Sequence, residues 1–355
     1  MRATRAAIGT ILLGALASCV KPTNTNFNET RPAAAPLAGG AGWTIVPGIA
    51  FTVGTAKGSN VGLSHVIETA PFDSLVISWN ATYPEWVTGE FGARVRIAGE
   101  WWPRGNGAVM ALVANGKISS APHIEDEATR LETDTLIVKP PCRADAISLF
   151  ATGQSIFPLR SMGIAHYLDA EKSTRVVDTV RSLAWGKTLD VKPRSQGSED
   201  PKIAPRICSP TSTAMALEYL GSAIPTKDFA ARVYDASADI YGNWTINAAR
   251  AGELVGEAFV AHFDTFGEIE REIEAGRPVV LSHSWKVGEL TGAPIATSKG
   301  HLIVVVGFTK DGDVVVNDPA ARPSEVRRVY PRRELFHTWQ HNGSGIVYIF
   351  RPGPR

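Results

Sequence analysis

Cys208 stands where a cysteine becomes reactive. It is followed by Ser209-Pro210-Thr211, residue types that favour the cap and first turn of a helix, and the helix pattern behind them ends at Gly221. At the start of a helix, unpaired N–H groups and the helix dipole favour a thiolate and lower the pKa of the thiol. These residues therefore predict a nucleophile, with a buried structural cysteine as the ordinary alternative.

A histidine and an aspartate are placed to serve this thiol. His301 opens a buried β-branched run, Asp318 closes the next one, and the turn Asp311-Gly312 lies between them. A hairpin of this kind brings Asp318 back beside His301, where a carboxylate can accept the second ring N–H and hold the tautomer. We therefore expect a triad of Cys208, His301 and Asp318. The alternatives are a strand-end histidine and a turn-forming Asn-Asp-Pro.

An amide side chain precedes the thiol. Gln196 lies twelve residues before Cys208 and could donate a hydrogen bond to a developing oxyanion, together with the Cys208 backbone N–H. The alternative is an exposed loop glutamine.

The elements that must position these residues lie in the second half of the chain. Helices are predicted at 208–221, 229–234, 245–255 and 268–274, and strands at 278–284, 301–309, 314–316 and 346–350. The order, with helices first and an antiparallel sheet after them, predicts an α+β domain.

The motifs form a set. Its members are Ser195-Gln196, Cys208-Ser209-Pro210-Thr211-Ser212, Gly242-Asn243-Trp244, Ala275-Gly276-Arg277-Pro278-Val279, Gly300-His301 through Gly307-Phe308, and Asn317-Asp318-Pro319. In order and spacing this set resembles the C39-like branch of the papain-like cysteine peptidases, over about residues 185–352. The resemblance implies a papain-like fold, Cys-His-Asp catalysis without a cofactor or metal, and an oxyanion role for Gln196.

The same resemblance places Asn243 and Trp244 near the substrate groove, although core packing is an equal alternative for Trp244. Many relatives hold the glutamine closer to the cysteine, so residues 197–205 must fold out if Gln196 is to reach Cys208. The best-known C39 peptidases are fused to transporters and cut double-glycine leaders. No transporter segment is visible in this sequence, so we do not carry that substrate over.

The first segment predicts export. Arg2 and Arg5 precede an apolar run of about 12 residues, which is shorter than the ~20 needed to span a bilayer. Its end, Leu16-Ala17-Ser18-Cys19, resembles the lipobox of bacterial lipoproteins. The resemblance implies lipidation of Cys19 and a location on a membrane surface of the bacterial cell envelope. A plain secretory signal is the alternative.

These patterns divide the chain into segments. We expect a signal peptide at 1–19, a flexible tether at 20–42, a β-sandwich domain at 43–165, a connector at 166–184 and the C39-like domain at 185–355. The expected strands of the sandwich include 74–80, 93–97, 135–138 and 146–150, and a short helix is predicted at 174–183.

Composition narrows the partners. The 355 residues carry 36 lysines and arginines against 35 aspartates and glutamates, so 36 − 35 gives a net charge of +1 and no electrostatic reason to expect nucleic acid. Cys19, Cys142 and Cys208 lie too far apart in the sequence for a zinc site. We expect Cys142 and Cys208 to be free thiols and the protein to be a monomer.

Three functions fit the sequence. The first is hydrolysis of amide bonds, in peptides or in peptidoglycan stem peptides, through a thioester on Cys208. The second is a non-catalytic surface binding protein that keeps a peptidase fold, which the β-rich domain would suit. The third is a cysteine acyltransferase, which uses the same residues and differs only in the acceptor.

Overall fold

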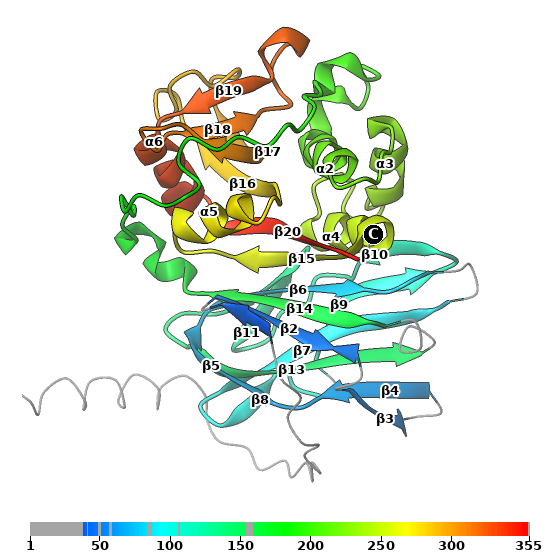
Figure 1. Cartoon of the computed structure of the whole chain (residues 1–355). Helices are drawn as coiled ribbons and strands as arrows, with labels where there is room; N and C mark the ends of the chain where they lie inside the picture. Colours follow the sequence, from blue (N-terminus) through cyan, green and yellow to red (C-terminus); the bar gives the residue numbers. More distant parts are fainter. Residues whose placement is uncertain are drawn as a thin grey trace, which may run out of the picture.

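The protein is described here by a computed structural model, and its described residues form three antiparallel sheets (Figure 1). The structure describes residues 38–40, 42–48, 51–56, 59–83, 87–105, 107–153 and 159–353. Two sheets form a β-rich part that ends near residue 167, and the third lies with the helices in the remainder. The mixture of helices and antiparallel sheets confirms the predicted α+β class.

The β-rich part contains a six-stranded and an eight-stranded sheet. The first has the order β1-β2-β14-β6-β12-β11, with bounds Ala38–Gly40, Trp43–Pro47, Ser161–Tyr167, Ser74–Asn80, Thr135–Val138 and Thr129–Glu132. The second has the order β10-β9-β7-β13-β4-β3, with β5 beside β13 and β8 beside β7. Its bounds are Lys117–Ser120, Ala108–Ala114, Gly89–Ile97, Ala144–Gly153, Ser59–Ser64, Phe51–Ala56, Ile67–Phe72 and Glu100–Trp102.

The four strands predicted in this part all lie within strands of the structure. Residues 74–80 and 135–138 match β6 and β12, while 93–97 and 146–150 fall inside β7 and β13. The packing of the two sheets as a β-sandwich stays a prediction.

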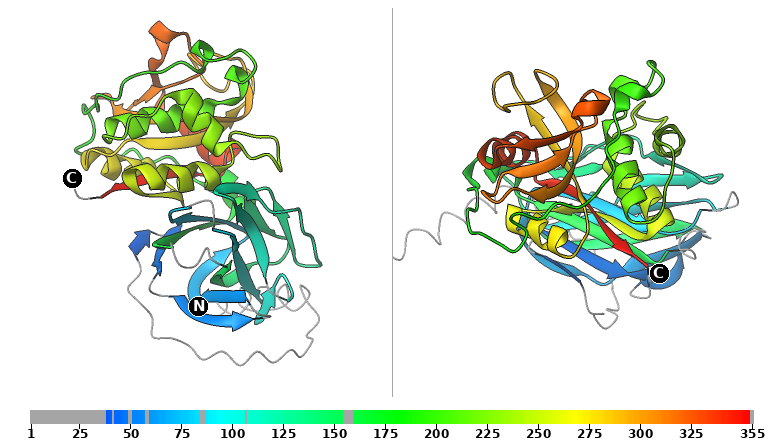
Figure 2. Two further views of the ribbon diagram at one scale, coloured as in Figure 1. Left: turned by 90° about the vertical axis from the view of Figure 1, so that its right-hand side faces the viewer. Right: turned by 45° about the horizontal axis from the view of Figure 1, so that its top comes forward.

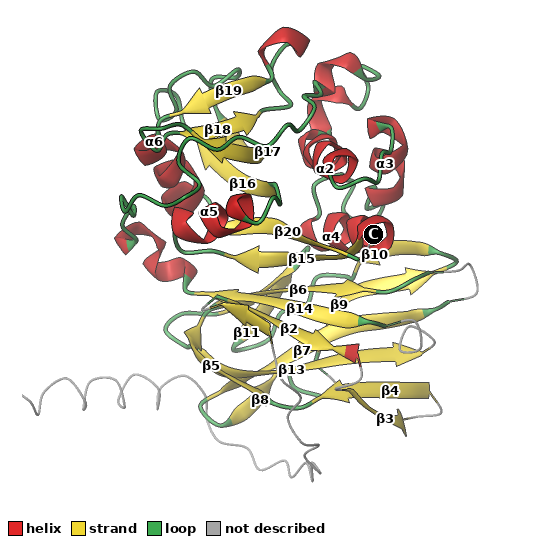
Figure 3. Cartoon of the chain, in the orientation of Figure 1, coloured by secondary structure: helices red, strands yellow, loops and turns green. Residues whose placement is uncertain are grey.

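The third sheet has the order β15-β20-β16-β17-β18-β19, and every pairing in it is antiparallel. Its bounds are Gly256–His262, Ile346–Pro352, Val279–Trp285, Ser298–Phe308, Val314–Asn317 and Arg327–Tyr330. The helices are α2 Cys208–Tyr219, α3 Thr226–Val233, α4 Trp244–Val255, α5 Phe266–Glu274 and α6 Arg332–Phe336. Figure 3 shows that α2 to α6 all lie in this part of the chain.

The connector differs from its prediction. A 3₁₀-helix, η3, covers Asp169–Thr174, but 175–183 forms no helix. Val176, Val180 and Leu183 are exposed, so the segment has no apolar face to bury against the core. Instead, the Asp178 carboxylate accepts hydrogen bonds from the backbone N–H groups of Phe266 and Gly267 at the start of α5. The helix predicted at 174–183 is therefore wrong, because tertiary contacts fix this stretch in an irregular path.

The two parts of the chain are joined through the edge strand β15. The backbone N–H of Ala258 donates to Asn80 Oδ1 at 2.9 Å, and that of Val260 donates to Ser78 Oγ at 3.1 Å. Both acceptors lie on β6, so side chains of the first sheet satisfy the open edge of the third. Figure 1 and the left view of Figure 2 show the third sheet and its helices stacked on one side of the β-rich part.

The cysteines do not behave alike. Cys208 is a free thiol, whereas Cys142 is buried and disulfide-bonded. The expectation of two free thiols is therefore wrong for Cys142. Cys19 and the predicted signal peptide and most of the tether lie outside the described residues. Within the described ranges, no helix is long and apolar enough to cross a bilayer.

Candidate active site

Cys208 is the first residue of α2 and is partly exposed. The helix begins as predicted, but its cap differs from the prediction. Ile207 occupies the N-cap position and no side chain caps the helix. Ser209 and Thr211 turn elsewhere: Thr211 Oγ1 donates to the Ile207 carbonyl at 2.6 Å, and the Ser209 hydroxyl meets the core. The first N–H groups of α2 are thus not used by a capping side chain.

Two hydroxyl groups fix α2 against the third sheet. Ser212 Oγ donates to the Leu302 carbonyl on β17 at 2.9 Å, one residue after His301. Ser209 Oγ and Tyr348 OH on β20 share a hydrogen bond of 3.1 Å. All side chains from Ser209 to Leu217 are buried, so α2 runs through the core and the Cys208 thiol lies at its N-terminus. These ties set the position of Cys208 relative to β17.

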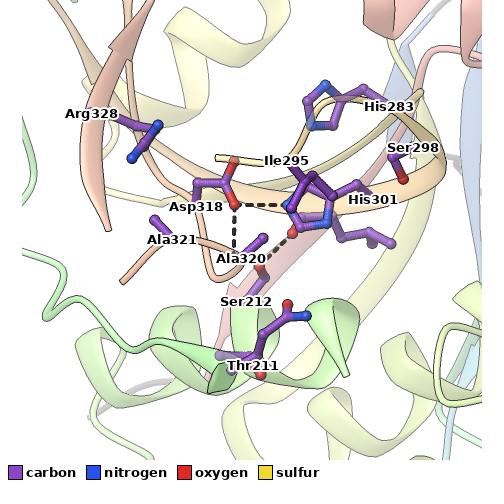
Figure 4. A network of polar contacts seen from close by, with 12 residues as sticks. Thr211, Ser212, His283, Ile295, Ser298, His301, Asp318, Ala320, Ala321 and Arg328 are labelled. Carbon is purple, nitrogen blue, oxygen red and sulfur yellow. Dashed lines mark hydrogen bonds and ion pairs between the residues drawn. The ribbon is translucent and has the colours of Figure 1, made fainter. Parts of the chain in front are cut away.

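His301 and Asp318 lie together, as the hairpin geometry predicted. His301 Nε2 and Asp318 Oδ1 are 2.8 Å apart, and both side chains are buried (Figure 4). His301 lies near the start of β17, and Asp318 directly follows β18, its hairpin partner. Gly312 supplies the positive φ of the turn, at +90°. Since Nε2 faces Asp318, Nδ1 is the ring nitrogen left for the thiol.

Tyr330 is a member of this network that the sequence analysis missed. Its hydroxyl on β19 donates to Asp318 Oδ2 at 2.5 Å, and the Ala320 N–H donates to Oδ1 at 2.9 Å. Burial alone would raise the pKa of Asp318, but the charge of His301 and these hydrogen bonds outweigh it and hold the pKa below its usual value. The carboxylate is therefore ionised and fully engaged. Only the pairing of β18 with β19 brings Tyr330 here.

The thiol and the imidazole perturb each other. Burial would raise the pKa of Cys208, but its hydrogen bond and charge interaction with His301 lower it below the ordinary value. Burial would lower the pKa of His301, yet the Asp318 charge and hydrogen bond, with the contact to Cys208, raise it to about 10. The two shifts run in opposite directions. At neutral pH they favour a thiolate facing an imidazolium.

Gln196 reaches the segment that leads into Cys208. Its backbone N–H donates to the Pro319 carbonyl at 2.9 Å, beside Asp318, and its side-chain Nε2 donates to the Ala204 carbonyl at 2.9 Å. The intervening residues fold back through two 3₁₀ turns, η4 Gln196–Ser198 and η5 Ala204–Arg206. One N–H of the Gln196 amide remains for another acceptor, and Oε1 has no partner among the described residues.

Asn243 and Trp244 are not brought into this network. Asn243 is buried, caps α4 by accepting from the Ile246 N–H at 3.1 Å, and donates to Asp235 at 2.9 Å. The backbone N–H of Trp244 donates to Asp134 Oδ2 of the β-rich part at 2.8 Å. Their contacts are those of a helix start at the junction of the two parts, and substrate binding by them stays a prediction.

Two aromatic side chains on β16 border His301, and neither was singled out for this role from the sequence. The ring of Trp285 lies edge-on at 5.6 Å from the His301 ring, and that of His283 lies at 5.7 Å. Both are buried. Their proximity depends on the register of β16 with β17, which local sequence patterns do not reveal.

Other candidate centres lie apart from this network. A pocket of about 550 Å³ is lined by Pro193, Arg194, Ser195, Ser198, Glu199, Ala223, Ile224, Pro225, Thr226 and Pro323. It includes none of the proposed catalytic side chains, so we do not treat it as the reaction centre. Within the described ranges, no group of three His, Cys, Asp or Glu residues could hold a metal ion.

The model of the Peptidase_C39 like family matches residues 188–347. One similar solved structure is the crystal structure of a double glycine motif protease from an AMS/PCAT transporter in complex with the leader peptide. It is 20% identical, the match covers 41% of this chain and 84% of that chain, and the TM-score of 0.27 is too low to support an argument. No curated protein matches the chain. Residues 188–347 of this chain thus form a domain of the C39-like peptidase family.

Proposed function

We propose that this protein hydrolyses amide bonds in peptides, with Cys208 as the nucleophile, His301 as the acid and base, and Asp318 as the group that orients His301. One observation carries the proposal. A buried carboxylate holds one nitrogen of a buried imidazole, and the other side of that imidazole meets a thiol at the mouth of a helix. Cysteine hydrolases need this arrangement for a thiolate nucleophile with a proton donor beside it.

The chemistry follows from the ion pair. The Cys208 thiolate attacks the carbonyl carbon of the scissile amide, and the electron pair of the C=O bond moves onto oxygen. As this oxyanion collapses, the C–N bond breaks and His301 gives its proton to the leaving amine. The product bound to sulfur is a thioester. A water molecule, deprotonated by His301, then attacks the thioester carbonyl, releases the acid and restores the thiolate.

The oxyanion needs hydrogen-bond donors. The backbone N–H of Cys208 and the free N–H of the Gln196 amide are the two donors that we propose for it. Gln196 is joined to the Asp318 segment through Pro319 and to the Cys208 segment through Ala204. This bracing supports a role near the reacting carbonyl rather than that of a free loop residue.

The substrate class is tested with the protein beside its Cys208→Ala variant. Both are incubated with peptide libraries and with purified peptidoglycan, and products are identified by mass spectrometry. Cleavage at an amide by the parent protein alone supports the proposal, and the cut position identifies the substrate class. Transfer of the acyl group to an added amine in place of water would instead identify an acyltransferase. Binding without any covalent change in either variant would contradict catalysis.

We also propose that the protein is exported and held at the bacterial cell envelope by lipid on Cys19. Intact mass measurement of the mature chain tests this, because processing at Cys19 removes the first 18 residues and acylation adds a known mass. The chain has three cysteines, and Cys208 is free while Cys142 is disulfide-bonded. A lipidated sulfur is unable to form a disulfide, so within one chain a lipid on Cys19 and the disulfide of Cys142 exclude each other. Mass before and after reduction therefore distinguishes a lipid-bearing Cys19 from one that is paired with another cysteine.

A further inference from the structure

A second histidine stands beside the proposed catalytic one. His283 on β16 is directly opposite His301 on β17 in the register of the sheet, so the two side chains share one face. Their ring centroids are 5.7 Å apart, and His283 is 1% exposed. Figure 4 shows the His283 ring beside that of His301, on the side away from Ser212 and Thr211.

The hydrogen bonds of His283 determine its tautomer. Its Nδ1 lies 3.2 Å from Thr338 Oγ1. The Thr338 hydroxyl donates its one hydrogen to the Leu335 carbonyl at 3.0 Å, so it can only accept from the histidine. The proton of His283 therefore sits on Nδ1, and Nε2 carries an unprotonated lone pair.

That lone pair is buried and without a partner. Nε2 of His283 has no hydrogen-bond partner among the described residues. An unpaired buried acceptor costs stability, and its presence in an enzyme site calls for an explanation. The charged and titratable groups around the ring are His301 on β17 and Asp318 after β18. Burial, with the charge of His301, lowers the pKa of His283 to about 3, so the ring stays neutral across the working pH range.

We propose that His283 is a positioning residue that stabilises the protonated form of His301. The ring turns its N–H end to Thr338 and leaves its negative lone-pair side to the dry interior beside His301. A dipole oriented in this way favours a positive charge on the neighbouring imidazole. This inference rests on the proposed function, since it concerns the ion pair of Cys208 and His301.

Two substitutions separate the lone pair from the bulk of the ring. His283→Asn keeps a donor at the δ position for Thr338 but has no acceptor at the ε position. His283→Gln places an amide oxygen at about the distance of Nε2. The lone-pair role predicts that Gln retains the behaviour of the parent protein and that Asn loses it. A role in packing alone predicts that neither substitution changes the ionisation of Cys208.

The readout is the pH dependence of Cys208 alkylation by iodoacetamide in the full chain, which needs no substrate. For His283→Asn we expect the midpoint of the acid limb to rise by about one pH unit, and the rate at pH 6 to fall about tenfold. His283→Gln should stay within about threefold of the parent rate. Thr338→Val, which frees the proton to leave Nδ1, should shift the midpoint in the same direction as Asn. Far-UV circular dichroism of each variant checks that it is folded.

The outcomes separate this inference from the proposed function. Suppose that the midpoint for Cys208 alkylation in the parent protein lies below that of an ordinary cysteine. If His283→Asn and Thr338→Val do not move this midpoint, the role of His283 is overturned while the triad stands. The same holds if Gln shifts the limb as much as Asn does. If the parent thiol titrates like an ordinary cysteine, the ion pair itself is absent and the proposed function fails with it.

Discussion

The two sides of the proposed reaction centre are built to different degrees. On the His301 side, the Asp318 carboxylate receives hydrogen bonds from His301, Tyr330 and Ala320. His301 lies on β17 and Tyr330 on β19, while Asp318 and Ala320 lie in the turn directly after β18, the strand between them. On the Gln196 side, the amide is half-buried and donates to a carbonyl of its own loop, and its oxygen has no partner in the part of the chain that the structure describes. If the proposed function holds, this difference predicts that the His301 side, here called the rigid side, is in place before substrate binds. The Gln196 side, here called the adaptable side, is then expected to complete its hydrogen bonds when substrate is bound.

The largest effect is expected at the shared centre of both sides. Cys208→Ala and His301→Ala should each lower kcat by about 10⁴-fold or more, since removing a nucleophile or its base leaves only binding and oxyanion contributions. Turnover of the cleaved peptide is the measurement. His123→Ala serves as the matched control, because His123 lies at the surface of the β-rich part. Full activity in Cys208→Ala would rule out the covalent mechanism.

Asp318→Asn tests the rigid side, where Asp318 pairs with His301. The amide keeps the size of the carboxylate but removes its charge, so the imidazolium is no longer stabilised and the tautomer is no longer fixed. We expect kcat to fall by about 10³- to 10⁴-fold with the fold retained. Alkylation of Cys208 should slow in parallel at neutral pH, because the thiolate loses its partner charge. A variant with normal alkylation kinetics would show that Asp318 does not act through the ion pair.

The adaptable side is tested by Gln196→Ala, with Gln196→Glu as an isosteric companion. Loss of one oxyanion donor should lower kcat by about 10²- to 10³-fold. Because Gln196 donates to Ala204 and not to the thiol, alkylation of Cys208 should change little in the alanine variant. This split between turnover and alkylation is what distinguishes the two sides. Equal loss in both assays would mean that Gln196 supports the thiolate instead.

Tyr330→Phe probes the outer part of the rigid side. It leaves one lone pair of a buried carboxylate unsatisfied, so we expect a loss of about 1–3 kcal/mol in the free energy of unfolding. The effect on kcat/KM should be smaller than that of Asp318→Asn, about tenfold. Chemical denaturation and steady-state kinetics give the two quantities. An unchanged stability would contradict the short hydrogen bond between Tyr330 and Asp318.

The contribution of the His301–Asp318 pair to the stability of the fold depends on pH. The raised pKa of His301 means that its pairing stabilises the fold fully below the ordinary imidazole pKa, and that this is lost as pH rises through about 10. The lowered pKa of Asp318 means that its contribution is present above the ordinary carboxyl pKa and is lost as pH falls below that value. Melting temperature measured from pH 3 to 11 should therefore decline at both ends. In His301→Ala the decline near pH 10 should be weaker.

Local signals and long-range register explain what could be predicted from the sequence. The Asp311-Gly312 turn and the two β-branched runs beside it are contiguous, so the contact between His301 and Asp318 follows from one hairpin. Tyr330 and His283 reach the same imidazole network across other strand pairs, whose register depends on the whole sheet.

Two further differences come from competition by tertiary contacts. Ser209 looks like a helix cap in sequence, but its hydroxyl meets Tyr348 in the folded core. The segment 174–183 has residues that suit a helix, but Asp178 binds the start of α5 and the apolar side chains find no surface to cover. Propensity was outweighed in both cases by partners far away in the chain.

The side chains of Ser78 and Asn80 have a consequence for how this protein can be truncated or recombined. They accept hydrogen bonds from the edge strand β15 of the third sheet. Without them, the N–H groups of this strand would be open to pairing with a strand of another molecule. Residues 166–355 expressed alone would leave these N–H groups of β15 without acceptors, and we expect this fragment to self-associate. The β-rich part and the C39-like domain therefore have to be kept together when this protein is truncated or fused to another.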